Sequence, residues 1–302
     1  MKKTLSFFLF TCSATLTLHA QQDPLYAQYL TTPLLINPAY TGYARNLSGS
    51  VAYRKQWANF DGSPETFNAA GSLALADNKM GIGMIALQDK IGSDITNEFQ
   101  FTYGYHVSLK QDMRLSFGLQ GGMVNYRTDY SGLTINPDDP KFTNQSEWHP
   151  TIGAGVILSN EKFFFSASMP KMLKRSTDAD SLATGLYNQN FYALGAYVWQ
   201  MSHRIKFKPW VLLRGEAKAP FSYDVGVAMT ADNSYTLAVF TRDLGTLGFM
   251  AQIELGDHFR FGYVFELPTA QSVGTRFTTH ELMLGARMRL FRFHDISSIR
   301  NF

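Results

Sequence analysis

The chain of 302 residues carries 27 basic and 24 acidic residues, and this small net charge of +3 gives no reason to expect a nucleic-acid partner. Charged residues make up only 17% and aromatic residues 14%, whereas soluble domains usually have about 25% charged residues. A mean hydropathy of -0.14 excludes a helical membrane protein, which would need apolar runs of about 18 residues or more.

Residues 1–20 are typical of a secretory signal peptide. A basic pair, Lys2 and Lys3, precedes a stretch of apolar and small residues over 5–18, and an acceptable cleavage site follows at Ala20. The mature chain would then carry 25 basic against 24 acidic residues, a net charge of +1.

The single cysteine, Cys12, lies inside this signal peptide. The mature chain would therefore contain no disulfide, although it leaves the cytoplasm. A lipoprotein acylated at Cys12 is the alternative, but Phe10 and Thr11 fit poorly where small residues are expected.

Residues 21–46 form an apolar segment that matches no regular element. Pro33 and Pro38 each remove a backbone donor, which excludes a helix interior or a central strand. We therefore predict an irregular segment in or across the periplasmic mouth of the fold that follows. We expect three tyrosines to anchor it to the inner wall: Tyr26, Tyr29 and Tyr40.

From residue 47 onward, apolar and polar residues alternate with a period of two, which predicts strands. In 99–109, for example, Phe, Tyr, Val and Leu occupy one face and Gln, Thr, Gly, His and Ser the other. Such faces favour an outer-membrane β-barrel with an apolar exterior and a polar lumen. We predict about fourteen antiparallel strands: 47–57, 65–76, 80–88, 95–109, 113–126, 150–158, 162–169, 190–201, 205–215, 221–230, 234–242, 247–255, 259–267 and 277–291.

Connections of two lengths alternate along these strands. The even-numbered ones, such as Asp77-Asn78-Lys79, are tight, and the odd-numbered ones are mostly longer. This is the pattern of periplasmic turns and outer loops, and it places both termini in the periplasm. The predicted barrel spans 47–293, and 294–302 is a periplasmic tail. A secreted β-sandwich is the alternative, but it explains neither the apolar outer faces nor the loop pattern.

Charged residues on the polar faces are expected to point into the lumen. Opposite charges that pair across neighbouring strands would account for them, and a selective pore or a docking surface is the functional alternative. The predicted lumen-facing residues are Arg54, Arg214, Glu216, Arg260, Glu266, Glu281, Arg287 and Arg289. The glycine-rich stretch 118–123 lies within a strand and is expected to form a smooth lumenal patch or a bend.

No motif for an enzyme or a metal site appears. His149 and His280 near the outer side lack a G-x-S-x-G serine motif, and no HExxH pattern exists. The acidic stretch 136–144 lacks the spacing of a calcium loop. We therefore expect no catalytic residue, no metal and no cofactor.

The two ends of the mature chain and one hairpin resemble the PorP/SprF family. The matching residues at the N-terminal end are Gln22, Pro24, Tyr26, Gln28, Tyr29, Asn37, Pro38, Ala39, Tyr40, Gly42, Arg54, Gln56 and Trp57. "KMGIGMIALQDKIG" (79–92) and "THELMLGARMRL" (279–290) match the family's glycine-rich hairpin and closing strand. The tail "SSIRNF" differs from the family's usual ending.

The resemblance implies a non-enzymatic protein of the Gram-negative outer membrane, in the type IX secretion and gliding motility machinery. It implies an adaptor in the outer-membrane lipid that helps particular secreted proteins, such as adhesins with a C-terminal secretion domain, to cross or dock. It also implies periplasmic partners, including an OmpA-like peptidoglycan-binding protein. The alternative is a diffusion channel or a transporter of hydrophobic solutes.

Overall fold

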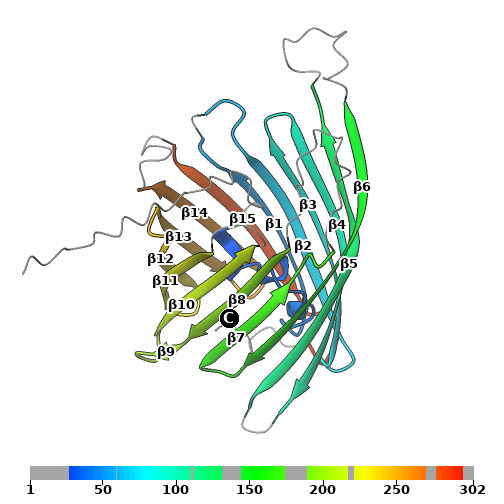
Figure 1. Ribbon diagram of the computed structural model, residues 1–302. Helices are drawn as coiled ribbons and strands as arrows, with labels where there is room; N and C mark the ends of the chain where they lie inside the picture. Colours follow the sequence, from blue (N-terminus) through cyan, green and yellow to red (C-terminus); the bar gives the residue numbers. More distant parts are fainter. Residues whose placement is uncertain are drawn as a thin grey trace, which may run out of the picture.

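The strands of this chain form one closed antiparallel barrel (Figure 1). The computed structural model describes residues 27–58, 60–109, 112–130, 144–173, 189–216, 221–269 and 277–294. The predicted signal peptide, and the tail beyond residue 294, lie outside these residues. The strands are β1 (Leu47–Lys55), β2 (Glu65–Leu75), β3 (Met80–Ile91), β4 (Asp94–Ser108), β5 (Arg114–Thr128), β6 (Gln145–Ser159), β7 (Phe163–Met169), β8 (Asn190–Tyr197), β9 (Trp199–Gln200), β10 (Ile205–Glu216), β11 (Ser222–Ala231), β12 (Tyr235–Arg242), β13 (Thr246–Leu255), β14 (Phe259–Pro268) and β15 (Thr279–Met288).

Each strand pairs with its neighbour in the chain, and the first strand closes on the last. Leu47 at the start of β1 lies opposite Met288 at the end of β15. Strands β8 and β9 both pair with β10 and are one strand interrupted at Val198. The barrel therefore has fourteen strands, which confirms the predicted number. Closure leaves no free sheet edge within the wall.

The outer face of the wall is apolar and the inner face polar. In β4, Phe99, Phe101 and Tyr103 are exposed on the outside, while Gln100 and Thr102 between them are buried inside. An exterior of large apolar side chains is unfavourable in water but suits the hydrocarbon of a bilayer. No helix among the described residues has the length and apolar character needed to cross a membrane.

The two ends of the barrel differ in their connections. We call one the turn end, where the connections are 76–79, 109–113, 160–162, 201–204, 232–234 and 256–258. Asp232 and Asn233 both have positive φ there, as tight hairpin turns require. At the opposite loop end 56–64, 129–144, 170–189 and 269–278 are longer, but 92–93, 217–221 and 243–245 are as short as the turns. The predicted alternation, in which the odd-numbered connections are mostly longer, therefore does not extend to these three connections.

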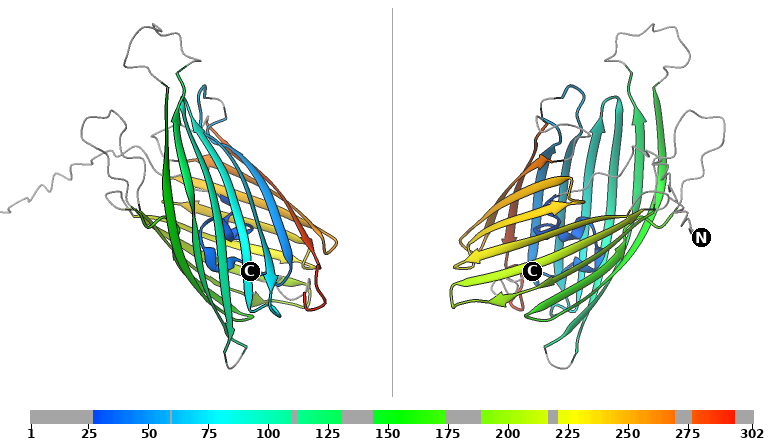
Figure 2. Two further views of the ribbon diagram at one scale, coloured as in Figure 1. Left: turned by 90° about the vertical axis from the view of Figure 1, so that its right-hand side faces the viewer. Right: turned by 60° about the vertical axis from the view of Figure 1, so that its left-hand side comes forward.

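The segment 27–46, directly before β1, lies inside the barrel, as both views of Figure 2 show for the dark blue ribbon. It forms three short 3-10 helices: η1 (Ala27–Leu30), η2 (Pro33–Leu35) and η3 (Pro38–Tyr40). Pro33 and Pro38 each occupy the start of a helix, where a missing N–H costs nothing. Asn37 caps η3 by accepting the Ala39 N–H at 2.8 Å.

Candidate functional site

Residues 27–46, which we call the lumen segment, occupy the interior of the barrel. Tyr29, Asn37, Ala39 and Thr41 are at most 1% exposed. Apolar side chains of the segment pack with inward residues of β6, β7, β10 and β12, such as Phe164 in β7. Leu34 packs on the opposite side, against Ala70 and Ile85 in β2 and β3. The segment therefore contacts the wall on both sides of the lumen.

The first part of the lumen segment is bonded toward the loop end. The Ala27 N–H donates to Glu281 Oε2 at 3.0 Å, and Trp210 Nε1 donates to the Tyr29 hydroxyl at 2.9 Å. Burial raises the pKa of the Tyr29 phenol well above its usual value. The hydroxyl therefore stays protonated and neutral in the interior.

The middle of the segment is bonded to β6 and β7. The Asn37 side-chain amide donates to the carbonyls of Val156 and Ala167 at 3.2 and 3.4 Å. Ser168 Oγ donates to the Ile36 carbonyl at 2.6 Å. Asn37 thus caps η3 with its oxygen and holds the wall with its nitrogen, so one side chain sets both the local turn and its position.

The last part of the segment reaches the turn end. His106 lies between Thr41 and Ser116: its Nε2 donates to the Thr41 carbonyl at 2.9 Å, and its Nδ1 is 2.7 Å from Ser116 Oγ. Arg114 donates to the Tyr43 carbonyl at 2.9 Å. The buried His106–Ser116 pair therefore has a positioning role for the segment.

Glycines on the inner wall allow this close approach. A Cβ at Gly118 in β5 would lie 2.1 Å from the Ala39 nitrogen, and one at Gly104 in β4 would lie 2.2 Å from the Thr41 oxygen. Any larger residue at either position would displace the segment. The glycine-rich stretch 118–123 thus forms, at Gly118, a lumenal surface against which η3 packs.

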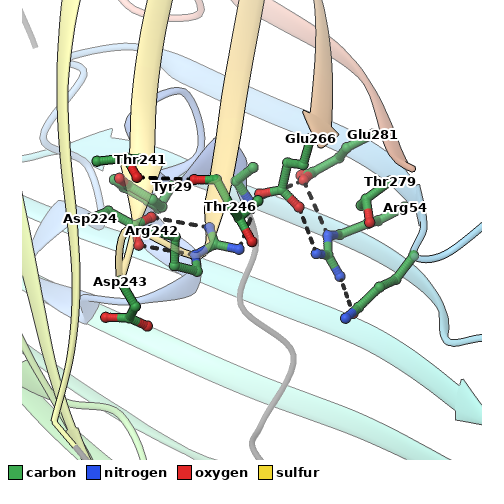
Figure 3. A network of polar contacts seen from close by, with 12 residues as sticks. Tyr29, Arg54, Asp224, Thr241, Arg242, Asp243, Thr246, Glu266, Thr279 and Glu281 are labelled. Carbon is green, nitrogen blue, oxygen red and sulfur yellow. Dashed lines mark hydrogen bonds and ion pairs between the residues drawn. The ribbon is translucent and has the colours of Figure 1, made fainter. Parts of the chain in front are cut away.

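A buried ion-pair network lies beside the start of the lumen segment (Figure 3). Arg54 in β1 bonds Glu266 in β14 at 2.9 Å and is 3.8 Å from Glu281. Arg242 in β12 is 3.0 Å from both Glu266 and Asp224. Burial of these charges would be costly if they were not paired. The network therefore links the wall from β11 to β1, and Glu281 joins it to the segment.

The remaining predicted lumen residues divide into three groups. Arg260 and Arg287 both bond Glu254 in β13, at 2.6 and 2.5 Å. Arg214 is buried, and Glu216 is half-buried at the end of β10. Arg289 lies beyond the end of β15 and is exposed, so its predicted lumenal position is wrong. The inward face of β15 stops at Arg287, because the strand ends one residue later.

Three important members of these networks were not predicted: Asp224, Arg242 and Glu254. Asp224 and Arg242 lie close to the ends of their strands, where alternation gives the weakest signal. Three of the motif residues, Gln22, Pro24 and Tyr26, lie outside the described residues, as does the Gln28 side chain. Gly42 has φ 72°, a conformation that glycine adopts readily.

The lumen segment lies deeper than the predicted location at the periplasmic mouth. It extends from Glu281, near the loop end, to Arg114 at the turn end. Tyr29 contacts Trp210, and Tyr40 stacks on Phe164 at 5.4 Å between ring centroids. Cavities of about 120 and 40 Å³ lie between the segment and the wall.

The outer histidines have ordinary partners. His149 is 3.2 Å from Glu147, and His280 lies 2.7 Å from the Tyr263 hydroxyl and 3.1 Å from the Thr278 hydroxyl. None of these partners is a serine. Within the described ranges, no group of three or more His, Cys, Asp or Glu side chains could hold a metal ion.

Residues 18–286 match the family described as "Type IX secretion system membrane protein PorP/SprF". No curated protein matches the chain. Among solved structures, Acinetobacter baumannii Omp33 is similar, with TM-score 0.45 and 10% identity over 81% of this chain and 97% of that one. The P. putida toluene transporter TodX is similar with TM-score 0.48 and 10% identity, over 85% of this chain and 94% of that one.

Proposed function

Because the chain belongs to the PorP/SprF family of type IX secretion system membrane proteins, we propose that it is a non-enzymatic outer-membrane adaptor. It helps specific secreted proteins, such as adhesins with a C-terminal secretion domain, to cross or dock at the outer membrane. It acts with periplasmic machinery, including an OmpA-like peptidoglycan-binding protein, and its loss impairs gliding motility where the organism glides.

The observation that carries this proposal is the lumen segment itself. A diffusion channel needs a continuous water-filled path, whereas here residues 27–46 lie in the lumen, most of their described side chains are buried, and they are bonded to strands on several sides. When the lumen is occupied by the protein's own chain, the surfaces at the two ends of the barrel are what other proteins can bind. The adaptor function uses those surfaces and requires no solute path.

In this proposal the turn end faces the periplasm and the loop end faces outward. One end of the barrel carries the short turns, the start of β1 and the end of β15. Outer-membrane barrels usually have their short turns in the periplasm and their longer loops outside. Machinery partners then bind the turn end. The secreted protein is handled at the loop end.

A deletion strain tests the proposal. We expect particular secreted proteins to be absent from the cell surface and medium, measured by mass spectrometry, and to return when the wild-type gene is supplied. Uptake of small hydrophobic and hydrophilic solutes should remain normal. Normal delivery of all secreted proteins in the deletion strain would exclude the adaptor function.

A planar-bilayer measurement tests the channel alternative. The purified wild-type protein should give no large, stable conductance steps. Stable open channels in the wild-type protein, together with a solute-uptake defect in the deletion strain, would favour the channel.

A further inference from the structure

The inward charges of the barrel are unequally distributed between its two ends. At the loop end, Arg54, Arg214, Arg242 and Lys171 lie among Asp89, Glu98, Asp224, Glu216, Glu266 and Glu281. At the turn end the described inward basic side chains, which we call the basic mouth, are Arg45, Arg114, Lys206, Lys208, Arg260 and Arg287. The one inward carboxylate described at that end is Glu254.

Glu254 is shared by two arginines of the basic mouth. Arg260 Nε lies 2.6 Å from one carboxylate oxygen of Glu254, and Arg287 Nη2 lies 2.5 Å from the other. Arg260 also donates to the Thr31 carbonyl at 3.2 Å. Two arginines of the basic mouth therefore share one carboxylate.

Other basic residues of the mouth lie near one another and have positively charged neighbours. Arg114 bonds the carbonyls of Tyr43 and Asn78 at 2.9 and 3.1 Å, and it is close enough to Arg45 for their charges to repel. Lys208 is likewise repelled by Arg260. Carbonyls satisfy hydrogen bonds without neutralising charge, so these two bonds leave the positive charge of Arg114 in place.

A cavity of about 120 Å³ opens among these groups. Arg260, Arg287, Asn46, Ser48 and Ser72 line it, together with the lumen segment from Leu30 to Leu34. This volume is close to the roughly 150 Å³ cavity that holds a benzene molecule, so it accommodates one short side chain. The Arg260 and Arg287 side chains remain 24% and 15% exposed, so an incoming group can reach them.

Among the residues that the structure describes, those on the outer rim of the turn end do not share this positive charge. Its exposed basic residues Lys79, Lys162, Arg204, Arg289 and Arg292 are matched by the exposed acidic residues Asp77, Asp112, Glu161, Asp232 and Asp257. A flat acidic surface would therefore gain little by covering the rim. The positive charge is accessible to a narrow chain that enters the mouth.

We propose that the basic mouth binds an acidic segment of a protein partner, with a carboxylate side chain in the cavity beside Arg260 and Arg287. Carboxylates match guanidinium groups through charge-assisted hydrogen bonds, and the serine hydroxyls and the Asn46 amide supply further donors. This inference rests on the proposed adaptor function, and it states the chemistry of the partner at the turn end.

Fluorescence anisotropy tests the proposal with the purified full-length mature protein in a non-ionic detergent. The probe is a fluorescein-labelled eight-residue peptide of alternating Glu and Gly, and the control peptide has Gln in place of Glu. We expect saturable binding of the Glu peptide, weakened by salt, and at least tenfold weaker binding of the Gln peptide.

Three variants locate the site. We expect R287Q to weaken binding of the Glu peptide about tenfold, as for loss of a hydrogen bond to a charged group, and R45Q to weaken it severalfold. R204Q removes the same charge from the exposed rim and should change affinity less than twofold. The shift in gel mobility between heated and unheated samples checks that each variant is a folded barrel.

Equal binding of the Glu and Gln peptides, or equal losses in R204Q and R287Q, would overturn the proposal. So would displacement of the Glu peptide by millimolar inorganic phosphate but not by millimolar acetate, because the mouth would then be a phosphate site. This experiment involves no secretion. A negative peptide-binding result therefore does not contradict the adaptor function. A negative deletion result contradicts the adaptor function but not the binding of the Glu peptide.

Discussion

Trp210 donates its indole N–H to the hydroxyl of Tyr29 at 2.9 Å, which joins β10 to a helix that lies 181 residues earlier in the chain. Both residues are almost fully buried, Tyr29 at 1% and Trp210 at 4% exposure. A buried polar bond of this kind favours one position of η1 against the wall, because a displacement that breaks it offers no water in exchange.

We expect Trp210→Phe to destabilise the barrel by about 1–3 kcal/mol, because it leaves the buried Tyr29 hydroxyl without its donor. Urea unfolding in detergent, followed by intrinsic fluorescence, measures the loss. Tyr29→Phe should cost less when combined with Trp210→Phe than the two single changes predict. Additive effects in this double-mutant cycle would show that the two side chains do not interact.

Glu266→Gln should be more damaging than either of these changes. It removes the carboxylate that pairs with both Arg54 and Arg242 and leaves them only Glu281 and Asp224 as acidic partners. Removing one partner from a buried ion pair costs about 3–5 kcal/mol. The control is Arg127→Gln, which breaks the exposed pair with Asp129 and should leave the urea midpoint unchanged. Similar midpoints for both variants would mean that the buried network contributes no stability.

The strands were predictable from sequence because the outer face of the wall requires apolar residues and the inner face requires polar ones, which produces a period of two along each strand. The predicted strand bounds are wrong where contacts other than the alternating pattern determine the end of a strand. Strand β6 begins at Gln145 and not at 150, although Pro150 lies within it. Pro150 lies opposite Met123 of β5, but the pairing of β6 with β7 starts only at Ala154 opposite Met169. On the β7 side Pro150 is therefore unpaired, and a missing donor on that side costs little.

The interior of the lumen was only partly predictable. The prolines correctly excluded residues 27–46 from the sheet, but they carry no information about depth. Depth depends on contacts such as that between the Asn37 amide and the Val156 carbonyl, which are 119 residues apart. A single sequence gives the polarity of a lumen but not the pairing of its side chains, so the partners Asp224, Arg242 and Glu254 emerge only from the structure.

A charge on the outer wall should prevent stable insertion. Phe101 in the middle of β4 is 73% exposed on the apolar face. We expect Phe101→Arg to cost about 2–4 kcal/mol in a bilayer, measured by urea unfolding in phospholipid vesicles. Phe101→Leu should have little effect. If Phe101→Arg inserted with wild-type stability, this face would not contact hydrocarbon.

Gly118→Ala should release the lumen segment without changing a single polar group. The new methyl group would lie 2.1 Å from the Ala39 nitrogen, and overpacking of this kind costs about 1–3 kcal/mol. Because β5 is held by ladders on both sides, η3 is the part that moves. We expect faster protease cleavage within residues 27–46 and intermittent conductance in planar bilayers.

Gly121→Ala is the matched control for this change, in the same strand and with the same added methyl group. The atom nearest to its Cβ would be the Thr151 oxygen at 3.9 Å, an ordinary contact distance. The control should therefore remain resistant to protease and closed. If Gly118→Ala were equally resistant and closed, the close approach of η3 to β5 would not be what keeps the lumen filled. If both variants conducted, the leak would come from the wall and not from the segment.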